Sequence, residues 1–444
     1  MRIANPPAYN DLFGQIGAER VVELMQKDFQ LGDTSNYHHW DKLRHLKPPE
    51  DLSHEEWWFV IKCSRGPMMR SVPLTDRMGK PLSYSTPDVI QRQLHYVDQR
   101  CSGEIAMPTV VTTDEQARQH YLVNSLMEEA IRSSQLEGAT TSRQVAKALL
   151  RSGRPPKDRS ERMIFNNYRA LQFMREVGRK LTPAIVCELQ RILTEGTLDN
   201  PDAAGQLQTP GEERVVVLDT ATGDALHVPP PAEQLPARLR ALCDFANQGE
   251  ESKQFIHPVV RGILLHFWLA YDHPFEDGNG RTARALFYWY MRTRRYWLVE
   301  YLSISRILRN APAKYAKSFL ATETDDGDLT YFINYQLLVI KRAVGVLHAY
   351  LARKAQEMRN VEQLMRRSQA FNHRQLALLS YALREPEESF TFRAHAESHG
   401  VTHETARNDL LPLVERGLLA RRTVRGRHVF TSPADLPDLL ASAT

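Results

Sequence analysis

The chain has 444 residues, of which 25% are charged and 42% hydrophobic, and its formal net charge is +4. This composition is that of a globular protein and excludes a disordered or collagen-like chain, while the length predicts two or three domains. The four cysteines form no CxxC pair, and no segment is apolar for long enough to cross a membrane, so we expect a cytoplasmic protein without structural zinc, disulfides or a membrane partner.

The first hundred residues show several short helical patterns. Apolar residues recur at helical spacing in residues 17–29, 37–45, 53–61 and 87–97. Ser53, with Glu56 three residues later, has the form of a capping box and predicts a helix start. His38 and His39 are expected at the surface, because no third metal ligand lies at a useful spacing. We predict an α-helical accessory domain over residues 1–110.

A longer helix is predicted for residues 114–136. Its apolar stripe consists of Leu122, Leu126, Ala130 and Ile131. Gly138 fits the left-handed position that commonly follows a helix. Ser133 and Glu137 lie in the last turn, where Glu137 taken by itself is an ordinary exposed acid.

The next region combines helices with one hairpin. Helices are predicted for residues 160–177, 182–193 and 233–246. Residues 214–218, which include Val215, Val216 and Val217, are rich in β-branched residues, and residues 225–228 return after a turn. This pattern predicts a β-hairpin, whose simplest role would be packing on the body of the domain.

A polar loop then joins two apolar helical segments, residues 262–271 and 285–291. The loop reads His273-Pro274-Phe275-Glu276-Asp277-Gly278-Asn279-Gly280-Arg281-Thr282-Ala283-Arg284. Buried polar groups need partners, so such a loop is not packing material.

The composition of this loop suits a polyphosphate. Gly278 and Gly280 can adopt positive φ and let a ligand approach the backbone, and Asn279 adds an amide donor. A helix restarting near Arg281 would offer free N–H groups to an anion. Arg281 and Arg284 lie three residues apart, so they share one helix face, and guanidinium groups match phosphate oxygens.

Two further residues of the loop suit catalysis. Asp277 is a hard oxygen ligand of the kind that Mg²⁺ uses beside substrate phosphates. His273 has an unperturbed pKa of about 6.5, which makes it the natural proton acceptor. The loop therefore predicts a site for a magnesium-bound triphosphate with a base beside it.

The run from His273 to Arg284 resembles the Fic motif, His-Pro-Phe-x-(Asp/Glu)-Gly-Asn-Gly-Arg-x-x-Arg, with every defining position filled. The resemblance implies a Fic helical core and a nucleotidyltransferase, most often one that moves AMP from ATP to a hydroxyl of a target protein. The implied roles are His273 as base, Asp277 for Mg²⁺, Gly278, Asn279, Gly280 and Arg281 for the α- and β-phosphates, and Arg284 for the γ-phosphate.

The same family explains the end of the predicted helix at residues 114–136. Ser133 and Glu137 resemble the inhibitory signature (Ser/Thr)-x-x-x-Glu-(Gly/Asn). The resemblance implies that Glu137 pairs with Arg284 and occupies the γ-phosphate position. ATP would then bind only in an unproductive pose.

Two other segments gain an implied role. The hairpin with Val215, Val216 and Val217 resembles the Fic flap, which clamps a target peptide by adding a strand. Tyr315, in a helical pattern over residues 310–322, would line the adenine pocket.

Two positions depart from the family pattern. Asp272 stands where the family usually has an apolar residue, and it either raises the pKa of His273 or faces solvent. The family often has Gly-x-x-Arg before the flap, whereas this chain has Gly205-Gln206-Leu207-Gln208.

After a long helix predicted from residue 328 to about 353, the C-terminal part resembles a winged helix. Helices are predicted for residues 374–383, 391–399 and 402–416, followed by a basic hairpin. On DNA, the base-facing residues would be Thr402, His403, Thr405, Arg407 and Asn408, and the phosphate contacts would be Arg425 and Arg427. A protein-interaction or dimer module is the alternative, because Glu404 and Asp409 oppose Arg407.

We therefore predict a mainly α protein with an accessory domain (1–110), a Fic domain (111–355) and a winged helix-turn-helix (370–432). The first functional hypothesis is an autoinhibited protein adenylyltransferase that uses ATP with Mg²⁺. The alternatives are a DNA-binding regulator whose Fic core senses nucleotide, and a deAMPylase in which Glu137 positions water. A homodimer is a further hypothesis.

Overall fold

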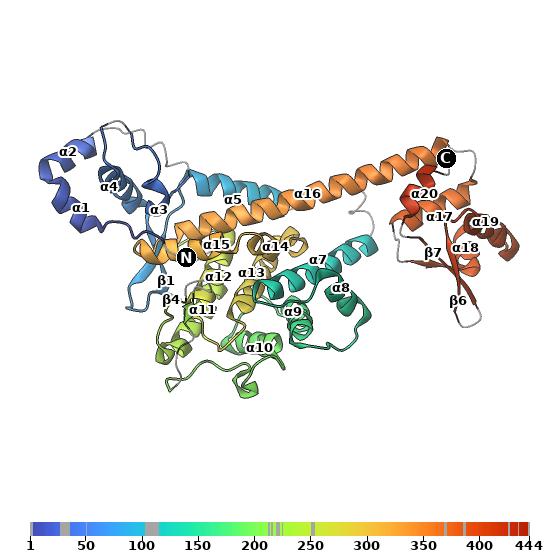
Figure 1. Ribbon diagram of the computed structural model, residues 1–444, viewed down its shortest axis with the longest axis horizontal. Helices are drawn as coiled ribbons and strands as arrows, with labels where there is room; N and C mark the ends of the chain where they lie inside the picture. The colour runs from blue at the N-terminus through green and yellow to red at the C-terminus, as the bar shows by residue number, and fades with distance from the viewer. Residues whose placement is uncertain are drawn as a thin grey trace. The chain divides into compact units, whose positions relative to one another are not determined.

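The computed structural model (Figure 1) describes the chain except residues 1–2, 27–35, 50, 103–114, 212–213, 215, 219–222, 224, 250–253, 368–370, 385–387, 425–426, 434 and 443–444. Most described residues are helical, and the strands form small antiparallel sheets, so the predicted mainly α fold is confirmed. The chain divides into two compact units, residues 1–105 with 120–345 and residues 106–119 with 346–444. Within the described part of the chain, no helix is long and apolar enough to cross a membrane.

The first unit begins with short helices. They are α1 Tyr9–Ile16, α2 Ala18–Gln26, α3 Trp40–Leu43, α4 His54–Arg65, a 3-10 turn Gly66–Met68 and α5 Asp88–Cys101. The predicted capping box at the start of α4 is confirmed, since Ser53 and Glu56 each accept the other's backbone N–H. Behind this cap, Trp57, Trp58 and Phe59 are buried against α1 and α2.

A two-stranded hairpin interrupts these helices, so the prediction of a purely helical N-terminal region was wrong. Strand β1 (Arg70–Thr75) pairs antiparallel with β2 (Pro81–Tyr84). Val72 and Leu74 point inward and alternate with exposed neighbours, which is the period of a strand. Pro73 between them is disfavoured in strands and concealed this pattern.

The core of the first unit is helical. Its elements are α7 Glu115–Leu136, α8 Arg143–Ser152, α9 Arg159–Glu176, α10 Pro183–Thr194, 3-10 turns at Pro201–Ala203, Ala232–Gln234 and Trp297–Tyr301, α11 Leu235–Asn247, α12 Pro258–Asp272, α13 Asn279–Thr293, α14 Ile304–Arg309, α15 Pro312–Thr324 and the start of α16 Thr330–Arg367. Helices α12 and α13 are buried on almost all sides, as expected for central helices. The polar loop between them therefore lies at the end of the core.

The predicted hairpin before α11 is present but short. Strand β3 (Val217–Leu218) pairs antiparallel with β4 (Ala225–His227). Val216 is not part of the strand, and Val215 lies outside the described residues.

One histidine is placed differently from its prediction. His39 is buried rather than exposed. It accepts the N–H of Asp41 at the start of α3, and its Nε2 lies 3.2 Å from the hydroxyl of Thr324 in α15. Burial lowers the pKa of His39 to about 4. The described residues contain no cluster of three or more His, Cys, Asp or Glu that could hold a metal ion.

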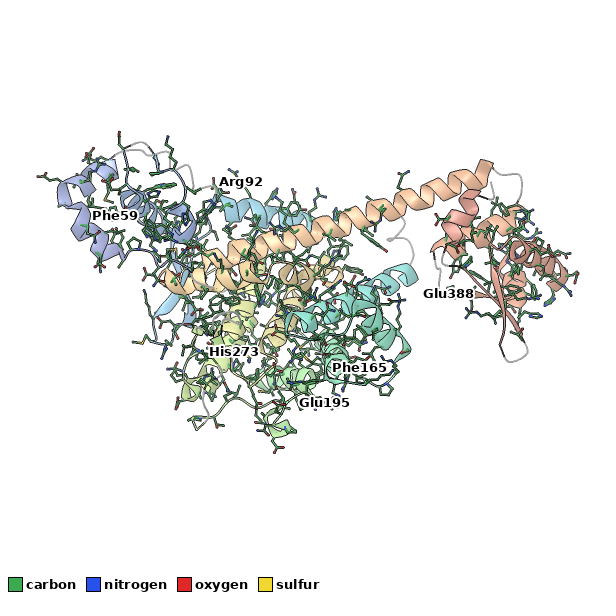
Figure 2. All side chains as sticks on the ribbon, in the orientation of Figure 1. Phe59, Arg92, Phe165, Glu195, His273 and Glu388 are labelled. Carbon is green, nitrogen blue, oxygen red and sulfur yellow. The ribbon has the colours of Figure 1, made fainter. Side chains whose placement is uncertain are left out.

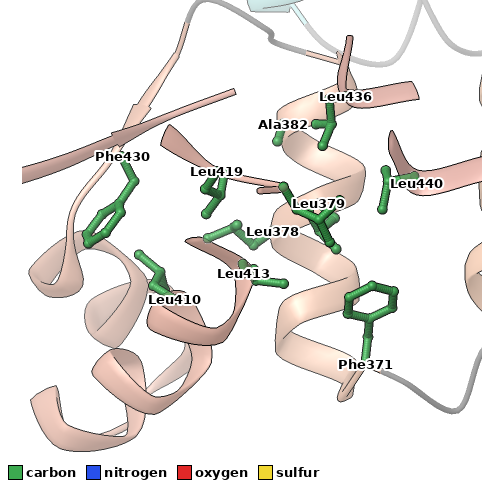
Figure 3. Packing of buried hydrophobic residues seen from close by; sticks show 11 residues of the cluster. Phe371, Leu378, Leu379, Ala382, Leu410, Leu413, Leu419, Phe430, Leu436 and Leu440 are labelled. Atoms are coloured by element: carbon green, nitrogen blue, oxygen red, sulfur yellow. The ribbon is translucent and has the colours of Figure 1, made fainter. Parts of the chain in front are cut away.

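The second unit contains the C-terminal elements. They are α17 His373–Arg384, β5 Ser389–Phe390, α18 Phe392–His399, α19 His403–Glu415, β6 Ala420–Val424, β7 Arg427–Thr431 and α20 Leu436–Ser442. The sheet order is β5-β7-β6, all antiparallel. Leucines of α17, α19 and α20 form one buried apolar cluster with Phe371 and Phe430 (Figure 3). The three predicted helices and the hairpin that follows them are therefore present. Strand β5 is too short to show a strand period, and α16 continues beyond its predicted end.

Candidate active site

His273 ends α12 in a left-handed conformation, with φ 46°. Such a backbone is uncommon for a residue other than glycine, and strained residues of this kind cluster at functional sites. Arg214 stabilises the bend, because its guanidinium donates to the carbonyls of Asp272 and His273 at 2.7 and 3.2 Å. His273, labelled in Figure 2, is half-buried. Its Nδ1 lies 3.3 Å from the carbonyl of Ala270.

The electrostatics keep this imidazole neutral. Burial, helped by the nearby His227 and Arg214, lowers the pKa of His273 to about 4. A neutral ring whose Nδ1–H donates to Ala270 has Nε2 free to accept a proton.

Asp272 neither faces solvent nor raises the pKa of His273, so both expectations for this residue were wrong. Its buried carboxylate pairs with Arg238 of α11 at 2.7 Å and accepts the indole N–H of Trp268 at 3.0 Å. Arg238 also donates to the hydroxyl and the carbonyl of Thr75 in β1. The positive charge of Arg238 compensates the negative charge of Asp272. Through its contacts with both residues, Arg238 also connects Thr75 of the β1–β2 hairpin to the end of α12.

The loop after His273 is braced by Asn279. Its side-chain oxygen accepts the N–H of Phe275 at 3.0 Å, and its amide donates to the carbonyl of Phe275 at 2.8 Å. We expected this amide to serve as a donor to a ligand, but the structure uses it within the loop. Gly278 precedes it at φ 83°, and a side chain there would collide with Thr194.

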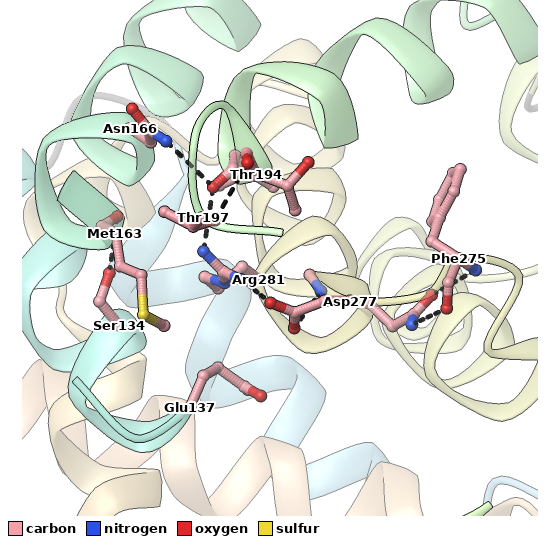
Figure 4. A network of polar contacts seen from close by, with 12 residues as sticks. Ser134, Glu137, Met163, Asn166, Thr194, Thr197, Phe275, Asp277 and Arg281 are labelled. Carbon is pink, nitrogen blue, oxygen red and sulfur yellow. Dashed lines mark hydrogen bonds and ion pairs between the residues drawn. The ribbon is translucent and has the colours of Figure 1, made fainter. Parts of the chain in front are cut away.

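Asp277 and Arg281 form a second brace (Figure 4). The Asp277 carboxylate accepts the N–H of Gly278 at 2.5 Å and pairs with Arg281 at 3.0 Å. Arg281 is fully buried and also donates to the carbonyl of Leu193. Asp277 remains 39% exposed, so its oxygens retain room for another partner. Each terminal nitrogen of Arg281 makes one of these contacts, and its buried Nε has no hydrogen-bond partner among the described residues.

Arg284 is bonded to the turn that follows α7. Its terminal nitrogen lies 2.8 Å from the Glu137 carboxylate, and it donates to the hydroxyl and carbonyl of Ser133 at 2.9 and 3.2 Å. Arg284 is buried, and within the described part of the chain its other terminal nitrogen has no hydrogen-bond partner. The predicted neighbours Ser133, Glu137 and Arg284 are thus brought together.

The Glu137 carboxylate lies against the first turn of α13. A side chain at Gly280 would collide with it and would come within 3.0 Å of the unpartnered Arg284 nitrogen. Free N–H groups of a helix N-terminus attract anions. An acidic side chain of the protein therefore occupies the position where the sequence predicts a ligand phosphate.

Comparison with known proteins agrees with this geometry. Residues 180–291 match the model of the Fic/DOC family. This part of the chain is a Fic domain. Over 60 residues the chain is 43% identical to "Protein adenylyltransferase Fic" of Nematostella vectensis, covering 14% of each chain. Over 54 residues it is 43% identical to "Protein adenylyltransferase fic-1" of Caenorhabditis elegans, covering 12% of this chain and 10% of that protein.

The match to these curated relatives is thus confined to a small part of their length. A solved structure of a C. elegans Fic-1 fragment aligns with a TM-score of 0.50 and 20% identity, covering 79% of this chain and 89% of that one. That likeness extends the shared fold beyond the segment matched in sequence.

Tyr315 of α15 lies near the Fic loop. Its hydroxyl is 2.8 Å from Nε2 of His266 in α12, and its ring packs beside Phe319 and Tyr335. Burial, together with Arg284, lowers the pKa of His266 to about 3. This histidine is therefore a neutral hydrogen-bonding residue of the core.

Two arginines of the Fic site were missed by sequence reasoning. Arg238 belongs to the stripe Leu235, Leu239 and Leu242, which is otherwise apolar and buried. A charge within an apolar stripe was the available signal, because it needs a buried partner. Arg214 also donates to the side chain of Gln208, but no pattern in the sequence marked this contact.

Proposed function

We propose that this protein transfers AMP from ATP to a hydroxyl group of a target protein and that Glu137 holds the enzyme inactive. The observation that supports this proposal best is the ion pair between Arg284 and Glu137 at the start of α13. At this place an anion site lies beside an unpartnered nitrogen of Arg284. The Glu137 carboxylate would compete there with a phosphate of the ligand. The names of the similar proteins, printed as protein adenylyltransferases, point to the same reaction.

In this reaction His273 acts as the base. Its neutral imidazole accepts the proton of the target hydroxyl at Nε2 while Nδ1 is oriented by Ala270. The hydroxyl oxygen then attacks the α-phosphorus of ATP, and the bond to pyrophosphate breaks. The proton is held on His273, and pyrophosphate leaves with the electron pair of the broken bond.

The nucleotide would be held by the N-terminal turn of α13 and by Arg284. Asn279 and Gly280 would contribute backbone N–H groups, whereas the N–H of Gly278 donates to Asp277, and Arg284 would contribute its unpartnered nitrogen to the γ-phosphate. Arg281 supports this turn through Asp277 and Leu193. Tyr315 would line the adenine pocket.

Asp277 fits Mg²⁺ because it is a partly exposed carboxylate beside the anion site. Mg²⁺ in nucleotide sites is bound by one or two carboxylates together with substrate phosphates, so a full set of protein ligands is not needed. The metal would neutralise phosphate charge when bound.

Glu137 inhibits by competition. One guanidinium cannot pair with the Glu137 carboxylate and with a γ-phosphate at the same position. With Glu137 in place, the triphosphate is displaced from the pose in which the α-phosphorus faces the target hydroxyl.

The experiment that tests this proposal is transfer of label from ATP carrying ³²P in the α-phosphate, in a lysate, with the wild type, Glu137→Gly and His273→Ala. We expect strong labelling of protein by Glu137→Gly and none by His273→Ala. The deAMPylase alternative predicts that Glu137→Gly abolishes removal of AMP from labelled protein. No specific contact favours that alternative.

We assign target binding to the hairpin of β3 and β4. Residues 216–218 would pair with an extended target peptide at the strand edge. Arg214 supports the assignment, because it connects the base of the hairpin to the backbone of His273. Gln208 stands at the position where the family often has an arginine, and in this chain its side chain accepts a hydrogen bond from Arg214.

A second function, DNA binding through the winged helix, is favoured by Asp409. This acid is buried, pairs with Arg374 at 2.7 Å and contacts His395, so its charge does not oppose Arg407 on the surface of α19. The other candidate residues Thr402, His403 and Asn408 are exposed, Thr405 is half-buried, and Arg425 and the side chain of Arg427 lie outside the described residues. A gel shift with Arg425→Ala and Arg427→Ala tests this function.

We also expect a cytoplasmic location. The cysteines support it, since none is in a disulfide: Cys63, Cys101, Cys187 and Cys243. A homodimer stays a hypothesis, and it predicts twice the mass of one chain when the purified protein is sedimented.

A further inference from the structure

Helix α7 carries a buried acid, Glu129, in addition to the exposed Glu137 that directly follows the helix. Glu129 and Ser133 lie four residues apart and share one face of α7. Glu137 follows four residues after Ser133, in the turn at the end of that face. Glu129 is 3% exposed, although it is ionisable. It also falls in the stripe that contains Leu122 and Leu126, where an apolar residue is expected.

The partners of Glu129 come from the start of α14. The hydroxyl of Ser303 donates to its carboxylate at 2.9 Å, and the backbone N–H of Ser305 donates at 3.2 Å. The hydroxyl of Ser305 donates to the other oxygen. Ser305 is fully buried, so losing Glu129 would leave these donors without a partner and without water.

A helix behaves as a rod with a rise of about 1.5 Å per residue, so Glu129 and Glu137 lie about 12 Å apart along it. Fixing α7 at Glu129 therefore fixes the direction in which its last turn points. On the same face, Ser133 and Glu137 both contact Arg284.

We propose that Glu129 is a positioning residue that attaches α7 to α14 and thereby holds Glu137 against Arg284. The proposal rests on the inhibitory role of Glu137 and adds the contact that maintains it. Glu129 does not touch the proposed nucleotide position. It acts through the placement of the helix.

Other contacts of α7 attach it to a different helix, α9. Asn167 of α9 donates to the carbonyl of Ala130 and the hydroxyl of Ser134, which holds α7 beside α9. Burial raises the pKa of Glu129, with Ser305 and Arg284 opposing the shift. The raised pKa agrees with a Glu129 carboxyl that is surrounded by protein groups instead of water.

The test combines Glu129→Leu with Glu137→Gly in the full chain. Transfer of label from ATP carrying ³²P in the α-phosphate should rise about tenfold in Glu129→Leu relative to the wild type. The double variant should exceed Glu137→Gly by less than about twofold, because residues that act through one contact are not additive. A tenfold fall in the double variant relative to Glu137→Gly would show that Glu129 supports the catalytic fold and would overturn the proposal.

Amide hydrogen exchange gives a readout that needs no activity. Exchange in residues 128–137 should be faster in Glu129→Leu by about tenfold, while α12 and α13 remain unchanged. Unchanged exchange in this segment would overturn the proposal. If Glu137→Gly transfers no label at all, the proposed function fails, and the exchange experiment still decides whether Glu129 holds α7.

Glu128 provides the matched control. It is the adjacent acid of α7, but its partners are Arg132 of the same helix and Arg143 of α8. Glu128→Leu should leave transfer within about twofold of the wild type, and equal activation by both variants would contradict a specific role for Glu129. If Glu129→Leu does not fold, Ser305→Ala removes one donor from the other side and should raise transfer in the same direction.

Discussion

The guanidinium of Arg284 and the carboxylate of Glu137 lie 2.8 Å apart, although 146 residues separate them in the chain. The arginine comes from the central helix α13 and is buried, whereas the glutamate follows α7 and is 31% exposed. The exposed partner can leave at lower cost than the buried one. Release of α7 is therefore the natural route by which the site would open for ATP.

The KM for ATP should rise even when Arg284 is replaced by lysine. In the Glu137→Gly background, we expect Arg284→Lys to raise the KM for ATP about tenfold, because an ammonium cannot reproduce the fork of a guanidinium. Steady-state kinetics with varied ATP measures this. Arg292→Lys is the control, since Arg292 on the same helix donates to the carbonyls of Met174 and Val177. A KM that Arg284→Lys leaves unchanged would exclude a phosphate contact.

The pair of Arg238 and Asp272 should be strongly coupled. Arg238→Met leaves a buried carboxylate without its cation and should cost about 3–5 kcal/mol of the free energy of unfolding. Arg238→Met combined with Asp272→Asn should lose less than Arg238→Met alone, because no charge remains buried. Urea unfolding of Arg238→Met, Asp272→Asn and the double variant decides this, and additive losses would disprove the coupling.

The activity should be insensitive to mildly acidic pH. His273 has its pKa lowered to about 4, so the base stays neutral as the pH falls from 8 to 6. We expect the transfer rate of Glu137→Gly to vary by less than about twofold over this range. A rate that halves near pH 6.5, the ordinary value for histidine, would contradict the environment described for His273.

The winged helix should bind DNA through charge. Arg425→Ala with Arg427→Ala should weaken binding to a duplex of random sequence and lower the slope of log Kd against log salt by about 2. Titration by fluorescence anisotropy at several salt concentrations gives both values. Arg306→Ala with Arg309→Ala removes the same charge from the first unit and is the control. Equal losses in both double variants would indicate non-specific attraction.

The local features of the site could be predicted from sequence, and the long-range contacts could not. The loop between α12 and α13 was predicted because its polar residues interrupt two apolar helices within twelve positions. The partner of Glu137 was predicted from the family resemblance, since nothing local connects it to Arg284. The partner of Asp272 was not predicted, because Arg238 lies in another helix and the pairing depends on how α11 packs.

The misses in the fold have similar causes. Pro73 concealed β1, and β5 consists of two residues whose pairing depends on Phe430 of β7. The sequence predicts His39 at the surface because it lacks further metal ligands, whereas its imidazole accepts the N–H of Asp41 at the start of α3. Asn279 was expected to serve a ligand, yet its amide and carbonyl match the backbone of Phe275, a match that becomes visible only once the loop is folded.

The most direct test of the central claim is the amount of AMP that purified Glu137→Gly protein attaches to protein from labelled ATP and magnesium. The account predicts labelling well above that of the wild type, and its loss when His273→Ala is added. Labelling that stays at the wild-type level in Glu137→Gly, with nucleotide absent from the first turn of α13 in crystals soaked with ATP, would contradict it.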